Sequence, residues 1–278
     1  MGIGESHLIA TLSAMPWCMH PVMFKTFEEV LNNKYIMNMN TTQLKEQQME
    51  SNPPVVKTGS FVNEKQIIPI QGTLIKKAYC AEMMSTPRTL ENVQTDLRNA
   101  YNNSDVETII LDIESPGGSV PGVSETANLI REVSKKKDVI ALGGGYLTSG
   151  AYWLASAASE IYVSDSTMVG SIGVIQAHVS VADKLKREGL KVTLIKAGEH
   201  KGAGHPAFDL SKEDLANIQA RVDDLYKVFV ENVANYRNVS VEKVYKEWAE
   251  ARVFTGKDAV DNGMVDGIAT LDEILSKI

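Results

Sequence analysis

The chain has 278 residues, of which 44% are hydrophobic and 23% are charged, and its formal net charge at pH 7 is −7. These proportions are those of a globular protein with one large core, and the negative balance argues against a basic nucleic-acid-binding surface. The apolar stretch 8–24 is interrupted by Pro16, His20 and Pro21, so it predicts neither a signal peptide nor a membrane anchor.

Cysteines and other metal-ligating residues are sparse. Cys18 and Cys80 lie far apart in the sequence, which favours a reduced intracellular chain, with a single disulfide as the alternative. The remaining candidate ligands form no recognised spacing: Asp112, Glu114, His200 and His205. The sequence therefore predicts no metal and no other cofactor.

Residues 1–62 differ from the remainder and are predicted to form an N-terminal extension with a linker. Phe24, Phe27 and Leu31 are spaced for one face of a helix over 20–35. The stretch 41–57 is rich in glutamine and asparagine and contains two adjacent prolines, which is typical of a linker. The main domain is predicted to span residues 63–278.

Short apolar strands alternate with helical patterns through most of this main domain. The predicted strands cover 67–70, 106–113, 139–142, 160–163, 171–175 and 192–195. The predicted helices cover 89–101, 123–135, 149–158 and 181–187. Apolar strands between helices imply a mostly parallel sheet with helices on both faces, so the fold class is α/β.

The C-terminal third carries an amphipathic helical stripe. Its apolar residues recur at spacings of three and four: Leu215, Ile218, Val222, Leu225 and Phe229. The stripe fits a helix packed on its own sheet, and it equally fits a contact between subunits.

The segment 114–119, with the sequence ESPGGS, follows the predicted strand 106–113. Its Pro-Gly-Gly turn leaves backbone N–H groups without side-chain cover, and two such donors can hold a developing oxyanion. The alternative is a turn with no chemical role.

The segment 143–152, with the sequence GGGYLTSGAY, places Ser149 before an alanine-rich helix. The helix dipole favours an alkoxide there, and the small residues Gly150 and Ala151 let a substrate backbone approach. The alternative is that Ser149 or Thr148 merely caps the helix.

The segment 197–206, with the sequence AGEHKGAGHP, holds Lys201 between small residues. Desolvation lowers the pKa of a lysine amine, which a general base near neutral pH requires. A solvated loop lysine is the alternative.

Together and in this order, these segments resemble the family of signal peptide peptidase A and the related phage head-maturation proteases, over about residues 64–270. The matching segments are 115–118, 148–152, 170–174, 197–201, 252–256 and 263–266. The resemblance implies a core like that of Clp protease and crotonase, assembled into a homo-oligomeric ring. It implies Ser149 as nucleophile, Lys201 as base, and Gly117 or Gly118 together with Gly150 as oxyanion donors.

Two departures favour the phage branch: the expected lack of an N-terminal anchor, and a single catalytic core after an extension of about 60 residues. Gly202 replaces the acidic residue that usually follows the lysine, so another group must orient Lys201. Ser171 is a candidate to hydrogen-bond its amine, with simple loop packing as the alternative.

The resulting prediction is a serine endopeptidase that uses a Ser–Lys dyad and an acyl-enzyme. By resemblance, its substrates are phage scaffold, capsid or portal proteins, cleaved in the host cytoplasm within an assembling head, and its own extension is a further candidate. The alternatives are a signal-peptide-degrading bacterial peptidase, a crotonase-like acyl-CoA enzyme and a non-catalytic scaffold. Within the peptidases, His178, on a predicted strand over 174–181, is an alternative base with Asp209; it otherwise lines the substrate cleft.

Overall fold

The structure, a computed structural model, describes residues 15–25, 61–62, 64–77 and 89–277. The chain divides into two compact units, which are described separately below. The sheet unit comprises Cys18–Gly173 and Val228–Ile278, and the Lys201 unit comprises Met1–Trp17 and Val174–Lys227. The linker predicted over 41–57, and most of the helix predicted over 20–35, lie outside the described residues.

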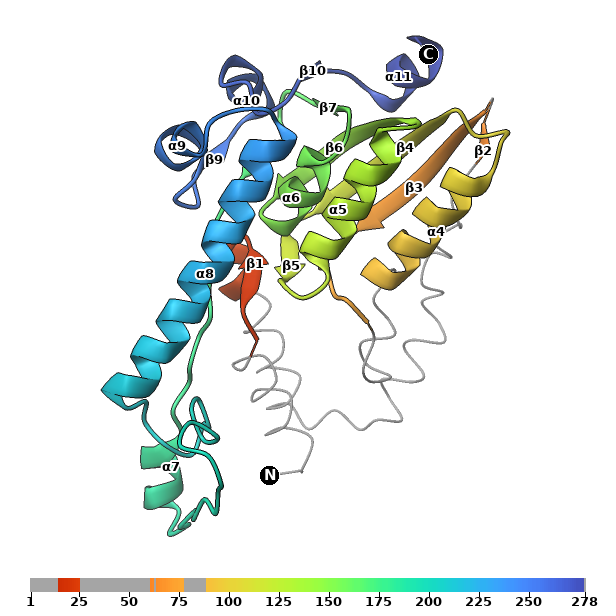
Figure 1. Cartoon of the computed structure of the whole chain (residues 1–278). Coiled ribbons are helices and arrows are strands. Elements are labelled where there is room, and N and C mark those ends of the chain that lie inside the picture. The colour runs from red at the N-terminus through yellow and green to blue at the C-terminus, as the bar shows by residue number, and fades with distance from the viewer. Residues whose placement is uncertain (1–14, 26–60, 63, 78–88, 278) are drawn as a thin grey trace, which may run out of the picture. The chain divides into compact units, whose positions relative to one another are not determined.

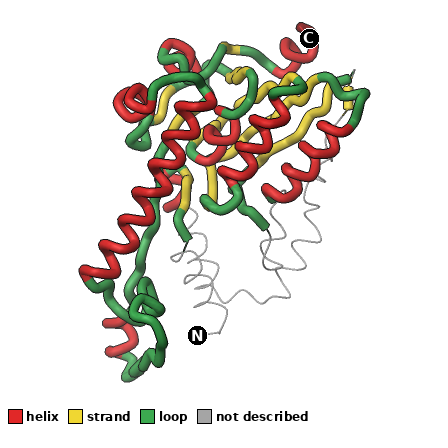
Figure 2. The backbone as a smooth tube through the Cα atoms, in the orientation of Figure 1, coloured by secondary structure: helices red, strands yellow, loops and turns green. Residues whose placement is uncertain are grey.

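Eight strands form the main sheet of the sheet unit (Figures 1 and 2). They are β2 (Phe61–Val62), β3 (Lys65–Gln71), β4 (Thr108–Ser115), β6 (Asp138–Thr148), β7 (Glu160–Val163), β8 (Met168–Gly170), β9 (Val253–Phe254) and β10 (Gly267–Ile268). The order is β10-β7-β6-β4-β3-β2, and β8 pairs with both β6 and β9. Only the β2–β3 and β8–β9 pairs are antiparallel. The predicted α/β fold with a mostly parallel sheet is confirmed.

Three helices cover one face of this sheet: α4 (Leu90–Asn102), α5 (Val123–Ser134) and α6 (Gly150–Ser156) (Figure 1). The start of α4 is fixed by a capping box, in which Thr89 and Asn92 satisfy each other's backbone N–H groups. Leu90, Val93 and Leu97 then fall on its buried face, as their spacing requires.

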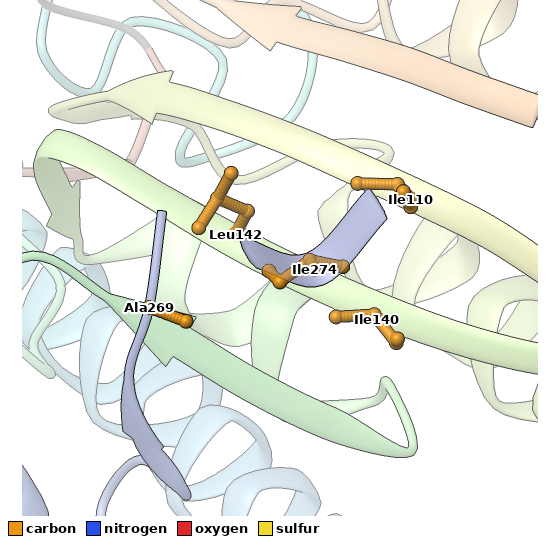
Figure 3. Packing of buried hydrophobic residues seen from close by; sticks show 5 residues of the cluster. All are labelled: Ile110, Ile140, Leu142, Ala269 and Ile274. Carbon is orange, nitrogen blue, oxygen red and sulfur yellow. The ribbon is translucent and has the colours of Figure 1, made fainter. Parts of the chain in front are cut away.

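Residues near the C-terminus pack on Ile110, Ile140 and Leu142 of the sheet. Ala269 and Ile274 join these three in one buried cluster (Figure 3), and Ile274 belongs to α11 (Leu271–Lys277). Ile110 and Ile140 are register partners, so their side chains share one face, while the neighbouring residues of each strand point to the other. Burial on both faces explains why β4 reads as a nearly continuous apolar run.

The remaining elements of the sheet unit are short. They are the helices α9 (Val241–Lys243) and α10 (Gly256–Asp261) and the π-helical turn η2 (Val244–Trp248). A separate two-stranded sheet joins β1 (Trp17–Met19) to β5 (Gly117–Ser119), as Figure 1 shows. Beyond β1, the N–H of His20 donates to the carbonyl of Pro116 at 2.9 Å.

The Lys201 unit contains α7 (Ala182–Arg187) and the first part of α8 (Lys212–Tyr236). The strand predicted over 192–195 is wrong: those residues take no regular structure, and Ile195 is 94% exposed. The strands predicted over 171–175 and 174–181 are also wrong, apart from an isolated bridge between Ile175 and Trp17. A strand needs a hydrogen-bonding partner along its length, and the described residues of this unit supply none.

The apolar stripe of α8 changes character along the helix. Leu215 is 54% exposed, whereas Phe229, Val230 and Val233 are fully buried. The Phe229 ring stacks on that of Trp153, with centroids 4.3 Å apart and an interplanar angle of 8°. The predicted packing of this helix on the sheet unit therefore holds for its C-terminal part, and a subunit contact through the remainder stays a prediction.

This difference predicts unequal costs for two substitutions on α8. Phe229→Ala removes a buried, stacked ring and should lower the free energy of unfolding by about 3–5 kcal/mol. Leu215→Ala, the control, should change it by no more than about 0.5 kcal/mol. Urea denaturation of both variants measures this, and equal effects would contradict the packing described here.

Candidate active site

Ser149 lies at a sharp turn between β6 and α6. Its backbone has φ 57° and ψ −122°, a conformation that is strained for any residue with a side chain. Two hydrogen bonds hold it: its N–H donates to the Gly170 carbonyl at 2.6 Å, and its carbonyl accepts from the Trp153 N–H at 3.0 Å. A strained strand–turn–helix junction is a geometry that presents a serine nucleophile.

The Ser149 side chain is fully buried, yet its Oγ has no hydrogen-bond partner among the described residues. It makes no capping bond to α6, and the neighbouring Thr148 hydroxyl is likewise buried and unpartnered. The interpretation of these residues as helix caps is therefore wrong. A buried hydroxyl without a partner costs stability, so it is a candidate for a functional group.

The Pro-Gly-Gly turn is held in place by the hydroxyl of Ser115. This Oγ donates to the Gly72 carbonyl at 2.6 Å and accepts from the Gly117 N–H at 3.2 Å. The Gly117 N–H is thereby engaged within the turn, which leaves Gly118 as the candidate oxyanion donor of the two predicted. A methyl group on Gly118 would lie 2.0 Å from the Leu74 carbonyl oxygen, so this position excludes every side chain.

The Cys18 side chain lies against the start of α6, because a methyl group on Gly150 would be 2.7 Å from its sulfur. The backbone N–H groups of Gly118, Cys18 itself and Gly150 lower the pKa of this thiol, since an N–H donor favours the thiolate. Burial has the larger effect and raises the pKa of Cys18 to about 12. The Pro-Gly-Gly turn lies beside Ser149, because a methyl group on Gly117 would be 3.0 Å from both the Gly150 nitrogen and the Ser149 Cβ.

Ser171 is positioned by the pairing of β8 with β9. It is buried, with φ 53°, and its N–H donates to the Arg252 carbonyl at 2.6 Å. The preceding residue, Gly170, accepts the bond from Ser149. The segment 170–171 therefore connects Ser149 to the segment that begins at Arg252.

The segments 252–256 and 263–266 support the backbone around Ser149 through packing and hydrogen bonds. Gly256 is required because a methyl group there would lie 2.0 Å from the Ser164 carbonyl oxygen. The Tyr152 hydroxyl donates to the Met264 carbonyl at 2.9 Å, which ties α6 to the segment 263–266. Asp266 in that segment accepts two bonds from Arg237, at 2.8 and 2.9 Å.

Lys201 belongs to the other unit. It is exposed, and its N–H donates to the Gly198 carbonyl at 3.2 Å within a turn. A methyl group on the next residue, Gly202, would lie 2.4 Å from Leu194 Cδ2, the end of an exposed side chain that would have to move.

His178 and Asp209, the alternative base and its partner, also lie in the Lys201 unit. The His178 Nε2 lies 3.2 Å from the Phe208 carbonyl oxygen, while the Asp209 carboxylate accepts from the Ser180 hydroxyl. In a Ser–His–Asp triad the carboxylate orients the imidazole. Here each has another partner, which argues against that reading.

One cluster of metal-ligand type occurs in the part of the chain described. Glu199, His200 and Glu213 place ligand atoms within 4.8 Å of one another, and all three are exposed. His200 also pairs with Asp214 at 3.3 Å. Exposed acidic groups commonly lie together on a protein surface, and we assign no metal to this cluster.

Comparison with known proteins identifies the family. Residues 131–278 match the profile of peptidase family S49, so the chain belongs to this family. The chain is 30% identical over 286 residues to head-tail preconnector protein GP5 of Enterobacteria phage P21, covering 98% of this chain and 56% of that protein. It is 30% identical to capsid assembly protease C of Escherichia phage lambda, and the match covers 82% of this chain and 51% of that protein. A putative signal peptide peptidase SppA of Enterococcus faecium is 31% identical, and the match covers 68% of this chain and 55% of that protein.

The expected family is thus confirmed, and with it the Clp protease/crotonase-like fold of that family. The chain spans about half the length of the phage proteins it matches. Among the described residues, none of the helices has the length and apolar character needed to cross a bilayer.

The unpartnered hydroxyl yields a stability prediction with a matched control. Ser149→Ala should raise the free energy of unfolding by about 1 kcal/mol, because it removes a buried polar group that lacks a hydrogen bond. Ser156, at the other end of α6, is equally buried but donates to the Trp153 carbonyl at 2.7 Å. Ser156→Ala should therefore lower it by about 1 kcal/mol. Thermal and urea denaturation measure the direction of each change in the free energy of unfolding. A destabilised Ser149→Ala variant would show that the Ser149 hydroxyl does have a hydrogen-bond partner.

Proposed function

We propose that the chain is a serine endopeptidase in which Ser149 attacks the peptide carbonyl and the N–H groups of Gly118 and Gly150 hold the oxyanion. The observation that carries this proposal is a strained, buried serine whose hydroxyl has no partner among the described residues, with the Pro-Gly-Gly turn packed against it. Backbone N–H donors beside such a serine stabilise the charge that develops in acyl transfer.

In the first half of the reaction, the neutral amine of Lys201 takes the Ser149 hydroxyl proton as Oγ bonds to the carbonyl carbon. The carbonyl oxygen becomes the oxyanion and receives bonds from Gly118 and Gly150. Collapse of this intermediate breaks the C–N bond, and the protonated lysine returns the proton to the leaving amine. The acyl group is then an ester of Ser149.

In the second half, the same amine takes a proton from water, and the resulting hydroxide attacks the ester carbonyl. The second tetrahedral intermediate uses the same two donors. Its collapse releases the carboxyl product and returns the proton to Ser149 Oγ. No metal or cofactor enters either half.

Lys201 is preferred over His178 as the base because the hydrogen bonds of His178 and Asp209 do not join them. An amine acts as a base only when it is neutral, which requires shielding from water in the working enzyme. We propose a homo-oligomeric ring as that working form, by resemblance to ring-forming peptidases. Ser171 remains a proposed hydrogen-bond partner of the amine.

The proposed substrates are scaffold, capsid or portal proteins of a phage head, cleaved in the host cytoplasm during assembly. The two phage relatives named above support this choice, and the alignment with the phage P21 protein extends over 98% of the chain, including its N-terminal region. The alignment with the Enterococcus peptidase covers only 68%. Degradation of signal peptides is therefore the second candidate.

The dyad is tested on an unstructured protein substrate such as casein between pH 6 and 10. Ser149→Ala and Lys201→Ala should each reduce cleavage by at least about 10³-fold, and the wild-type rate should rise with pH because only the neutral amine accepts a proton. His178→Ala serves as the control and should retain activity.

Circular dichroism first establishes that each variant is folded. Loss of activity in His178→Ala with retention in Lys201→Ala would reverse the assignment of the base. Full activity in a folded Ser149→Ala variant would refute the serine mechanism itself.

A further inference from the structure

We propose that β1 is an autoinhibitory segment of this chain, in which Cys18 fills the oxyanion site and must withdraw before a substrate can bind. This inference rests on the proposed function, since it assigns a regulatory role at the same site. It concerns a residue that the mechanism does not use, on a strand far in sequence from Ser149.

The contacts place β1 on the site itself. The backbone N–H groups of Gly118 and Gly150 act on the Cys18 sulfur and lower the pKa of its thiol. A methyl group on Gly150 would lie 2.7 Å from that sulfur, and one on Gly117 would lie 2.2 Å from the Cys18 carbonyl oxygen. The backbone of Cys18 therefore lies directly against the Pro-Gly-Gly turn and the start of α6, where the scissile peptide must approach.

β1 is held by strand pairing, as a bound peptide substrate would be. β1 pairs as a strand with β5, and the bond from the His20 N–H to the Pro116 carbonyl continues this attachment. Cys18 is fully buried and Met19 is 3% exposed. Pairing of an extended segment with a strand, with side chains in pockets, is a common mode of peptide recognition. Substrate and β1 therefore compete for one place.

Because the Cys18 thiol binds the site only weakly, β1 can leave it again. The two N–H groups favour an anion, but burial outweighs them and raises the pKa of Cys18 to about 12, so the sulfur is present as a neutral thiol. A neutral thiol is a weak hydrogen-bond acceptor, whereas the tetrahedral oxyanion is a strong one. The site is thus blocked by a group that binds it far less well than the transition state does.

The test compares two arginine substitutions on this segment in the full chain. Cys18→Arg places a cation against two N–H donors in a buried site, which should expel β1. Val22→Arg adds the same charge at a position that is 64% exposed. We expect Cys18→Arg to cleave casein at least about 10-fold faster than wild type, as follows if less than a tenth of the chain is open, with Val22→Arg unchanged. A folded Cys18→Arg variant no faster than wild type would overturn the proposal.

A second variant guards against misfolding of Cys18→Arg. Cys18→Ala only removes the sulfur from the two donors, and it should raise the rate in the same direction by about 3-fold. A rate equal to or below that of wild type in this folded variant also counts against the proposal.

The position of β1 can also be tested without measuring catalysis, which separates this inference from the proposed function. In the Ser149→Ala chain, alkylation of Cys18 by iodoacetamide is followed by mass spectrometry of the Cys18 peptide, with the urea-unfolded chain as reference. A seated β1 should slow alkylation by at least about 10-fold. A rate equal to that of the unfolded chain would show that β1 does not occupy the site. Slow alkylation combined with casein cleavage by Ser149→Ala would instead refute the serine mechanism and leave the seating of β1 intact.

Discussion

The active-site geometry depends on one backbone constraint, the positive φ of Ser149. Such a conformation costs about 1–3 kcal/mol, and it persists because the Gly170 carbonyl fixes the Ser149 N–H at 2.6 Å. Gly170 is fixed in turn by β8, which pairs with β6 and β9. The N–H of Ser171 extends this support to the Arg252 carbonyl. Residues more than a hundred positions apart in the sequence therefore determine where a single hydroxyl points.

The same constraint explains why glycine recurs around the site. Turning the chain at Ser149 brings the backbone of Gly150 against that of Gly117, and any side chain at Gly117 would collide with its neighbours. Ser115 engages the N–H of Gly117 within the turn, and the N–H of Gly118 is one of the backbone groups that lower the pKa of the Cys18 thiol. In the proposed mechanism the N–H groups of Gly118 and Gly150 hold the oxyanion. A group that reaches these donors, as we propose for the Cys18 thiol, would therefore compete with substrate.

Much of this could be predicted from the sequence, because the signals were local. Apolar runs and glycine-rich strand ends indicated the sheet and the segments around Ser149, Gly118 and Lys201. The choice of Gly118 over Gly117 could not be predicted, since it depends on a hydrogen bond to Ser115. The seating of Cys18 depends on pairing between β1 and β5, which are distant in sequence. The strand predicted over 192–195 failed because apolar residues favour a strand only where a partner strand is available.

Trapping of an acyl-enzyme tests the central claim most directly. The wild-type chain is mixed with an activated ester of a short peptide, quenched in acid within seconds, and mapped by mass spectrometry. The account predicts the acyl mass on the peptide that contains Ser149, and its loss in Ser149→Ala. An acyl group on another residue, or peptide hydrolysis by a chain that never carries one on Ser149, would contradict it.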